Sequence, residues 1–227
     1  MKERGISQEG LKLLACLTML ADHTGMVLFP GQMGFRMIGR LAFPIFCFLL
    51  TEGAHYTKNP ARYALRLAVG AFLSELPFDL ACSGGWDWGS QSVMLTLLIG
   101  FLMLVCMKRT ESLPLRVLMV IPFAALAEAC QTDYGASGIV LIGIFALTRG
   151  ADSWLRTLLV FAGLLLVPSI RITVLGIRFP MELLGIFAMA PILLYSGKKR
   201  SYSKPLQWAF YLFYPVHLTL LWLIKVL

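Results

Sequence analysis

The sequence has few charged residues, few histidines and no grouped cysteines. Only 14% of its 227 residues are charged, three are histidine and five are cysteine, whereas 58% are hydrophobic. The cysteines stand singly, without a CxxC pair or a Cys/His spacing, so we predict no zinc or other metal site. Glycine-rich phosphate loops and the HExxH and GxSxG motifs are absent as well, so no common catalytic signature identifies the chemistry.

Long apolar runs make up most of the chain. The mean hydropathy is +0.77, and a soluble domain of this size cannot bury so many apolar side chains. We therefore predict an all-α polytopic membrane protein with about nine spans, folded as one domain over residues 1–227. The expected spans are 9–29, 37–56, 63–81, 91–107, 114–130, 135–148, 157–170, 180–196 and 206–226. The short spans at 135–148 and 157–170 are also compatible with tilted helices, a re-entrant pair or interfacial segments.

The loops between the spans carry unequal numbers of basic residues. Those after even-numbered spans hold twelve, and the other connections hold four. Because inward loops are enriched in Lys and Arg, the N-terminus is expected in the cytoplasm. The same rule accounts for the net charge of +8, which therefore does not indicate a nucleic-acid partner. The twelve are Lys58, Arg62, Arg66, Lys108, Arg109, Arg116, Arg149, Arg156, Lys198, Lys199, Arg200 and Lys204, and the four are Arg36, Arg40, Arg171 and Arg178.

A histidine stands well inside the first expected span. Residues 11–29 have the sequence LKLLACLTMLADHTGMVLF, with Lys12 near the start and Asp22 and His23 past the middle. Eleven residues of α-helix turn about 1100° and rise about 16 Å, so Lys12 and His23 share one face. We expect the lysine at the membrane surface and the histidine near mid-depth. Ionisable groups at that depth are costly and often functional, and a polar pair that only holds two helices together is the alternative.

Other polar residues are expected in the outer half of the membrane. Arg36 and Arg40 are four residues apart at the outer start of the second span, and His217 lies inside the last span. Glu75 and Asp79, four apart at the outer end of the third span, are the expected ion-pair partners of the two arginines. Such a cluster should face a wet cavity. For the arginines, snorkelling to lipid headgroups is the alternative.

Two prolines interrupt expected spans. Pro44 and Pro215 each remove a backbone donor and free the carbonyl four residues earlier. We expect Pro44 to bend the second span and Pro215 to turn the last span, and with it His217, towards the cavity. His217 is then either a second catalytic or binding group or a structural histidine.

A neutral imidazole near mid-membrane can take a proton from a hydroxyl or an amine. A carboxylate can fix its tautomer and support the charge that forms, which makes Asp22 a second candidate catalytic residue. Neighbours in a helix point about 100° apart, so direct pairing is poor and we expect Asp22 or His23 to pair across helices. A cation about 16 Å away at the cytoplasmic surface suits a phosphate. A long substrate with phosphates at one end and a reactive group at the other would span the distance from Lys12 to His23. Acetyl-coenzyme A, with its phosphates and its thioester at opposite ends, has this shape.

Three segments resemble the TraX family: MLADH in the first span, RMIGRLAFPIFCFLLTEGAHYTKNPARYALRL after it, and YLFYPVHL near the C-terminus. The resemblance implies an integral-membrane protein linked to N-terminal acetylation of conjugative pilin. It also places the chain with transmembrane acyltransferases that use acetyl-coenzyme A from the cytoplasm. Those enzymes carry a basic residue, ten intervening residues and a histidine in the first span. Lys12 and His23 match that pattern, with Lys in place of the common Arg, whereas Arg36 and Arg40 are more widely spaced than the arginine pair of that group.

The sequence and the resemblance together predict an acetyltransferase of the bacterial inner membrane. Acetyl-coenzyme A would bind from the cytoplasm, with its phosphates near Lys12 and the loop that contains Arg62 and Arg66. His23, with Asp22 beside it, would act as general base on an extracytoplasmic hydroxyl or amine, or would carry the acetyl group itself.

The acceptor side of the expected site consists of Arg36, Arg40 and His217. The arginines would bind the acceptor or stabilise the developing oxyanion, and His217 would line the pocket. The acceptor could be a protein N-terminus, a glycan or a lipid. The expected partners are therefore membrane lipids, the coenzyme A thioester and this acceptor.

A proton-coupled transporter or flippase is the main alternative, because buried His, Asp and Arg in wet cavities suit a carrier equally well. Against it, the two halves of the chain show no repeat symmetry and no paired broken spans. A non-catalytic membrane chaperone for a surface protein is a third interpretation.

Overall fold

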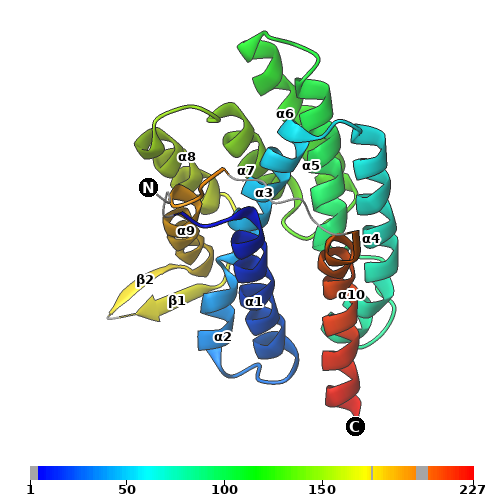
Figure 1. Ribbon diagram of the computed structural model, residues 1–227. Coiled ribbons are helices and arrows are strands. Elements are labelled where there is room, and N and C mark those ends of the chain that lie inside the picture. The colour runs from blue at the N-terminus through cyan, green and yellow to red at the C-terminus, as the bar shows by residue number, and fades with distance from the viewer. Residues whose placement is uncertain (1–4, 175, 198–203) are drawn as a thin grey trace.

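Helices form almost all of the regular structure in the computed structural model, which describes residues 5–174, 176–197 and 204–227 (Figure 1). The α-helices are α1 (Gln8–Val27), α2 (Met33–Gly39), α3 (Ala42–Tyr56), α4 (Pro60–Cys82), α5 (Val93–Met107), α6 (Leu113–Ala129), α7 (Gly135–Leu147), α8 (Ser153–Leu165), α9 (Met189–Leu193) and α10 (Lys204–Val226). A hairpin of β1 (Arg171–Val174) and β2 (Ile177–Pro180) and a 3-10 helix, η1 (Met181–Ala188), precede α9. The predicted all-α class is confirmed.

Two helical stretches among the described residues are both long and apolar enough to cross a membrane. They are Met33–Tyr56, which comprises α2 and α3, and Gln207–Val226 in α10. Four shorter apolar helices also overlap expected spans: Val93–Met107, Gly135–Leu147 and Met181–Leu193 lie within them, and Ser153–Leu165 begins four residues before the span expected at 157–170. The figure of nine spans stays a prediction, since a compact bundle can also contain short apolar helices in its core.

The second expected span is broken one turn before its proline. α2 ends at Gly39 and α3 begins at Ala42. Pro44 offers no N–H to the carbonyl of Arg40, and its ring would clash with that carbonyl, so the helix is interrupted there. The predicted bend at Pro44 is thus confirmed. By contrast, α10 runs through Pro215 as one helix.

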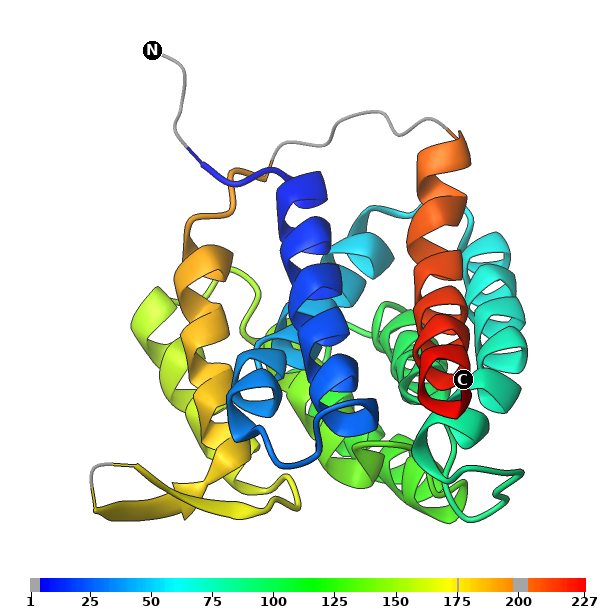
Figure 2. The same cartoon turned by 90° about the horizontal axis from the view of Figure 1, so that it is seen from below.

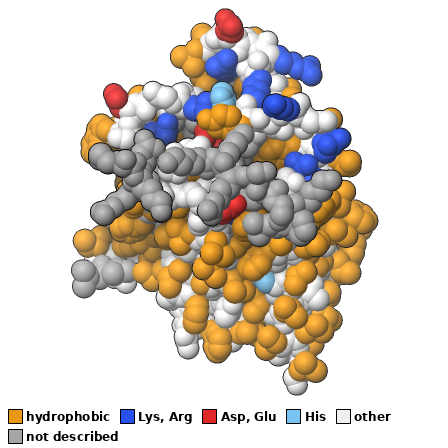
Figure 3. Space-filling view, viewed as in Figure 1, with side chains coloured by type: hydrophobic (Ala, Val, Ile, Leu, Met, Phe, Trp, Pro, Cys, Tyr) orange, Lys and Arg blue, Asp and Glu red, His pale blue; other side chains and the backbone are white. Residues whose placement is uncertain are grey.

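The basic loops gather at one end of the molecule. Lys108, after α5, donates through Nζ to the carbonyl of His55 at the end of α3 (2.8 Å), and Arg149, after α7, donates to Glu52 (2.9 Å). Figure 3 shows blue side chains over the upper part of one face and mostly orange ones below. This segregation agrees with the predicted cytoplasmic end. Lys198, Lys199 and Arg200 lie outside the described residues, as does the side chain of Lys204.

α1 occupies a central position, where it packs on α2, α3 and α10 (Figures 1 and 2). α10 in turn packs on α4, and α3 packs on α5 and α7. Fully buried apolar side chains join these helices, among them Leu11, Ala15, Ile45, Phe101 and Leu218. Polar groups on the inner faces of α1, α2 and α10 are therefore held between well-packed helices.

The region after α8 differs from the sequence-based expectation. Residues 157–170 and 180–196 were expected as two spans, but α8 ends at Leu165, a β-hairpin follows, and the next helix begins as 3-10. In the hairpin, Arg171 pairs with Pro180 and Ile172 with Phe179, and Gly176 has φ +81° at the turn. Glycine adopts that conformation without strain. Both views show the hairpin projecting beyond the helices at one corner (Figures 1 and 2).

Candidate functional site

Two histidines from distant parts of the chain meet in the interior. Nδ1 of His23, on α1, lies 2.6 Å from Nε2 of His217, on α10. The two rings stack with centroids 4.9 Å apart, and the Tyr214 ring meets both edge-on. Both histidines are buried. The two rings meet because α1 and α10 pack side by side. The sequence analysis expects His217 to line the pocket, but His217 is not among the wall residues of the cavities described below and reaches the site only through His23.

The hydrogen bonds of His217 determine where the protons lie in the neutral pair. Nδ1 of His217 is 2.6 Å from the carbonyl oxygen of Phe213, which can only accept, so Nδ1 carries the proton. Nε2 of neutral His217 is then an acceptor, and Nδ1 of His23 donates to it. Nε2 of neutral His23 is consequently unprotonated. Among the described residues this nitrogen has no hydrogen-bond partner, so its lone pair is available as a base or a nucleophile.

Asp22 does not contact the histidines and instead binds two arginines. Arg36 donates through Nη1 to Asp22 Oδ2 (2.8 Å), and Arg40 donates through Nη2 to Oδ1. Arg40 also donates through Nη1 to Glu182 of η1 and through Nε to the carbonyl of Arg36 (3.1 Å). The expected pairing across helices therefore occurs for both Asp22 and His23. In this arrangement Asp22 positions the arginines and does not orient the His23 ring.

Gly39 makes the approach of Asp22 possible. A Cβ built at Gly39 would lie 2.2 Å from Cβ of Asp22, closer than any real contact. The glycine between Arg36 and Arg40 thus leaves the space that the carboxylate fills. In short helix α2, the spacing of the two arginines directs both guanidinium groups to the same acid.

The expected partners of the arginines were wrong. Glu75 accepts from the backbone and hydroxyl of Ser92 (Oγ to Oε1, 2.6 Å), and Asp79 accepts from the backbone N–H of Asp87 (3.2 Å). These carboxylates hold the loop before α5, whereas Asp22 and Glu182 neutralise the arginines. Charge periodicity within one helix could not identify a partner from another helix.

A large cavity, here called the outer pocket, lies beside Asp22 and its two arginines. Its polar wall residues include His23, Asp22, Arg36, Arg40, Asp133, Tyr134, Ser169 and Glu182. Its volume is about 910 Å³. Arg36 is 22% exposed and Arg40 only 7% exposed. Arg36 therefore presents its remaining donors to a molecule in the outer pocket, whereas Arg40 is occupied by two carboxylates.

The loop between α6 and α7 contributes two residues that sequence analysis did not assign to the site, Asp133 and Tyr134. Tyr134 has φ 66° and stacks on Phe43 of α3. Burial raises the pKa of the Asp133 carboxyl to about 6, against the opposing effect of the Arg40 charge. A non-glycine residue at positive φ is uncommon, so this backbone conformation must be maintained by its surroundings.

A second cavity lies around Lys12 and is here called the lysine cavity, with Gln8, Lys12, Phe46, Tyr63, Phe210 and Tyr211 among its walls. Its volume is about 100 Å³. Nζ of Lys12 lies 5.4 Å from the centroid of Phe210, and the Arg66 guanidinium lies over the rings of Tyr63 and Tyr211 (5.4 and 5.9 Å). Of the three expected phosphate-binding residues, only Lys12 lines this cavity. Arg66 is not in its wall but contacts two of its aromatic rings, and Arg62 is exposed and lines none of the cavities described.

A third, small cavity of about 40 Å³ shares wall residues with both of these sites and is here called the inner cavity. It is lined by His23, Asp22, Phe46 and Tyr134 among others. His23 is shared with the outer pocket, and Phe46 is shared with the lysine cavity. Because α1 is a continuous helix from Gln8 to Val27, the three cavities follow one face of it from Lys12 to His23.

The matching family model is that of the TraX protein, and it covers residues 7–225. A protein of Dichelobacter nodosus, named "Probable fimbrial assembly protein FimC, serogroup H1", is 29% identical over 229 residues, which cover 93% of this chain and 92% of that protein. An uncharacterized protein of Rickettsia prowazekii is 49% identical over 53 residues, which cover 23% of this chain and 21% of that protein. No solved structure matches the chain.

Proposed function

The chain belongs to the TraX family, and on this premise we propose that it transfers an acetyl group from cytoplasmic acetyl-coenzyme A to an amine or hydroxyl on the outer side of the membrane. The observation that carries the proposal is the position of His23, which borders both the outer pocket and the inner cavity. A donor approaching from the Lys12 side and an acceptor in the outer pocket would both reach the same imidazole.

The donor would enter through the lysine cavity. Lys12 and Arg66 supply the positive charge for its phosphates, and the Tyr63, Phe210 and Tyr211 rings offer apolar surface. The rise of about 16 Å between Lys12 and His23 on one helix suits a molecule with phosphates at one end and a thioester at the other. Because Phe46 lines both adjoining cavities, its ring must move aside when the thioester passes.

In the chemical step, Nε2 of His23 takes the proton of the acceptor as its nitrogen or oxygen attacks the thioester carbonyl. The carbon–sulfur bond breaks, the acetyl group stays on the acceptor, and the imidazolium returns its proton to the coenzyme A thiolate. His217 accepts a hydrogen bond from His23 and stabilises the imidazolium, so it acts as a positioning residue. A covalent route, with the acetyl group passing through Nε2, uses the same nitrogen.

The arginines have different roles in this proposal. Arg36 binds the acceptor or the developing oxyanion with donors that Asp22 does not use. Arg40, held by Asp22 and Glu182, keeps Arg36 and η1 in place. Asp22 thus supports the site without proton transfer, which replaces its expected catalytic role.

A pilus-related acceptor is the first to test. The resemblance links the family to pilin acetylation, and the Dichelobacter nodosus relative is named as a fimbrial assembly protein. We therefore propose the N-terminal amine of a pilin subunit as the acceptor class, with His23 removing its proton.

The experiment uses the full chain co-expressed with the pilin of its own host, and mass spectrometry of the pilin N-terminus. We expect the wild type to add one acetyl group, His23→Ala to abolish the addition, and Leu17→Ala to leave it unchanged. Leu17 is a matched control, because it lies on the same helix and is 54% exposed. Full acetylation by correctly inserted His23→Ala protein would contradict the proposal.

Binding of acetyl-coenzyme A to the purified protein tests the donor separately. Calorimetry should show binding that weakens about tenfold in Lys12→Met and does not change in Arg109→Met, which removes an exposed charge that lines none of the cavities described. Absence of binding to folded protein, together with proton-driven uptake in sealed vesicles without coenzyme A, would support the transporter instead.

A further inference from the structure

A fourth cavity opens at the end of the bundle that carries the basic loops, and it is called the basic pocket. Its volume is about 490 Å³, and its walls include Thr51, Lys108, Leu113, Arg116, Leu147 and Arg149. These residues come from the C-terminal part of α3, the residue that follows α5, the first turn of α6, and the end of α7 with the loop after it. By the predicted orientation, this end of the molecule faces the cytoplasm.

The basic pocket has an excess of positive charge. Lys108, Arg116 and Arg149 line it, and none of the described residues in its wall is acidic. Glu52, outside the wall, accepts from Nε of Arg149 (2.9 Å) and neutralises only one of the three. Burial and the nearby Arg149 charge both lower the pKa of Lys108. An anion in the pocket would relieve this excess.

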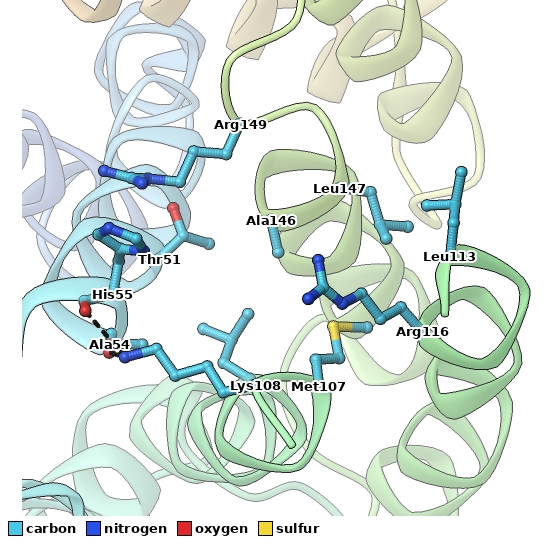
Figure 4. A pocket seen from close by; sticks show the side chains of 11 residues that line it. Thr51, Ala54, His55, Met107, Lys108, Leu113, Arg116, Ala146, Leu147 and Arg149 are labelled. Atoms are coloured by element: carbon cyan, nitrogen blue, oxygen red, sulfur yellow. Dashed lines mark hydrogen bonds between the residues drawn. The ribbon is translucent and has the colours of Figure 1, made fainter. Parts of the chain in front are cut away.

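Arg116 is the cation with the most unused binding capacity. Its Nε donates to the carbonyl of Thr110 (2.8 Å), which fixes the side chain, whereas its terminal nitrogens have no partner among residues that the structure describes. Figure 4 shows the guanidinium turned towards the open middle of the pocket. A planar guanidinium held in this way is suited to a bidentate phosphate contact.

The other wall of the pocket is apolar and continues along a helix surface. Met107, Leu113 and Leu147 lie beside Arg116 (Figure 4). From Leu113, the exposed face of α6 continues through apolar side chains at a spacing of four residues, Val117 and Ile121, which are 47% and 64% exposed. An occupant with an anionic head and an apolar tail would satisfy both walls.

We propose that the basic pocket binds the phosphate headgroup of an anionic phospholipid, whose acyl chains lie along α6. Basic pockets between membrane helices on the cytoplasmic side recognise such headgroups. Arg116 makes the main phosphate contact, with Lys108 and Arg149 at the opposite side of the pocket.

The basic pocket is separate from the proposed acyl-donor route. None of its wall residues lines the lysine cavity, the inner cavity or the outer pocket. Lipid binding at the basic pocket and acetyl transfer at His23 can therefore be tested independently, and failure of one proposal does not contradict the other.

Native mass spectrometry of the full-length, delipidated protein tests the proposal. The protein is incubated with equal amounts of phosphatidylglycerol and phosphatidylethanolamine that have the same acyl chains. We expect the wild type to retain phosphatidylglycerol in preference to phosphatidylethanolamine. The amount of phosphatidylglycerol bound to Arg116→Gln should be about tenfold lower than that bound to the wild type. Arg109→Gln, which removes a neighbouring exposed charge outside the pocket, should behave as the wild type. Arg116→Lys keeps the charge and should retain an intermediate amount.

Two results would overturn the proposal. One is equal retention of phosphatidylglycerol by the wild type and by Arg116→Gln, with both proteins folded by thermal melting. The other is displacement of the lipid by millimolar inorganic phosphate or coenzyme A, with Arg116-dependent binding of that soluble phosphate to lipid-free protein. In that case the occupant is a soluble phosphate compound. If Arg116→Gln fails to fold, the comparison of Arg116→Lys with Arg109→Gln decides the same question.

Discussion

The outer pocket and the basic pocket both contain arginines, but carboxylates neutralise the arginine charge to different extents in the two pockets. In the outer pocket, Arg40 is 7% exposed and contacts two carboxylates, Asp22 and Glu182. In the basic pocket, Arg116 has a single backbone acceptor, and its terminal nitrogens face the cavity. The first arginine is bound within the protein, and the second is available to a ligand.

Burial explains the difference. A buried charge is stable only when it is paired, because its desolvation is costly. The side chain of Arg116 is half-buried, so it remains closer to water and has less need of an internal partner. We therefore interpret Arg40 as structural, and we propose Arg36 and Arg116, whose pairing is incomplete, as binding residues.

Removing Arg40 should have the largest effect. Arg40→Met leaves Glu182 buried without a cation and Asp22 with Arg36 alone, so we expect a loss of about 3–5 kcal/mol in the free energy of unfolding. Arg116→Met, at the basic pocket, should change it by no more than about 0.5 kcal/mol. Denaturation of the detergent-solubilised proteins measures both, and equal losses would contradict the distinction between the two pockets.

Loss of the hydrogen-bond acceptor at His217 should slow catalysis. His217→Phe keeps the ring but cannot accept from Nδ1 of His23, so we expect acetyl transfer to fall about 100-fold. In His217→Gln, an amide oxygen can replace Nε2 and should restore part of the rate. Similar rates of acetyl transfer for His217→Phe and His217→Gln would argue against His217 as a positioning residue. They would indicate that His217 only packs against its neighbours.

A methyl group at Gly39 should displace Asp22. Gly39→Ala places a Cβ within 2.2 Å of Asp22, and we expect a destabilisation of about 1–3 kcal/mol. Gly34→Ala is the matched control on the same helix, because nothing lies within 4 Å of its built Cβ. The control should be neutral or slightly stabilising, since alanine is the better helix former. Thermal unfolding of both variants tests whether Asp22 needs the space at residue 39.

The last prediction concerns the pH dependence of stability at Asp133. Its pKa is raised from 3.8 to about 6, so the folded state holds the proton longer than the unfolded state does. Its contribution to stability is therefore full below about pH 4 and is lost as pH rises to about 6. Asp133→Asn should flatten this part of the stability curve relative to wild type. The charged groups that act on this carboxyl are Arg40, Asp22 and Glu182, and they remain in the variant. Identical curves for the two proteins would show that Asp133 does not titrate there.

Several features could be predicted because they depend on residues close in sequence. The helical class follows from long apolar runs, and the break before α3 follows from Pro44. The shared face of Lys12 and His23 follows from helix geometry. The hairpin at 171–180 was missed, because the sequence analysis treats residues 171–179 only as a short connection between two expected spans and does not predict paired strands there.

The amino-acid sequence was enough to single out the polar residues inside or beside expected spans, including His23, Arg36, Arg40 and His217. Their partners became known only from the folded chain: Asp22 with the two arginines, Glu182 with Arg40, and His217 with His23. Helix periodicity gives the direction of a side chain on its own helix. Which helix packs against that face depends on the packing of the whole chain, and the pairing of buried charges depends on that packing in turn.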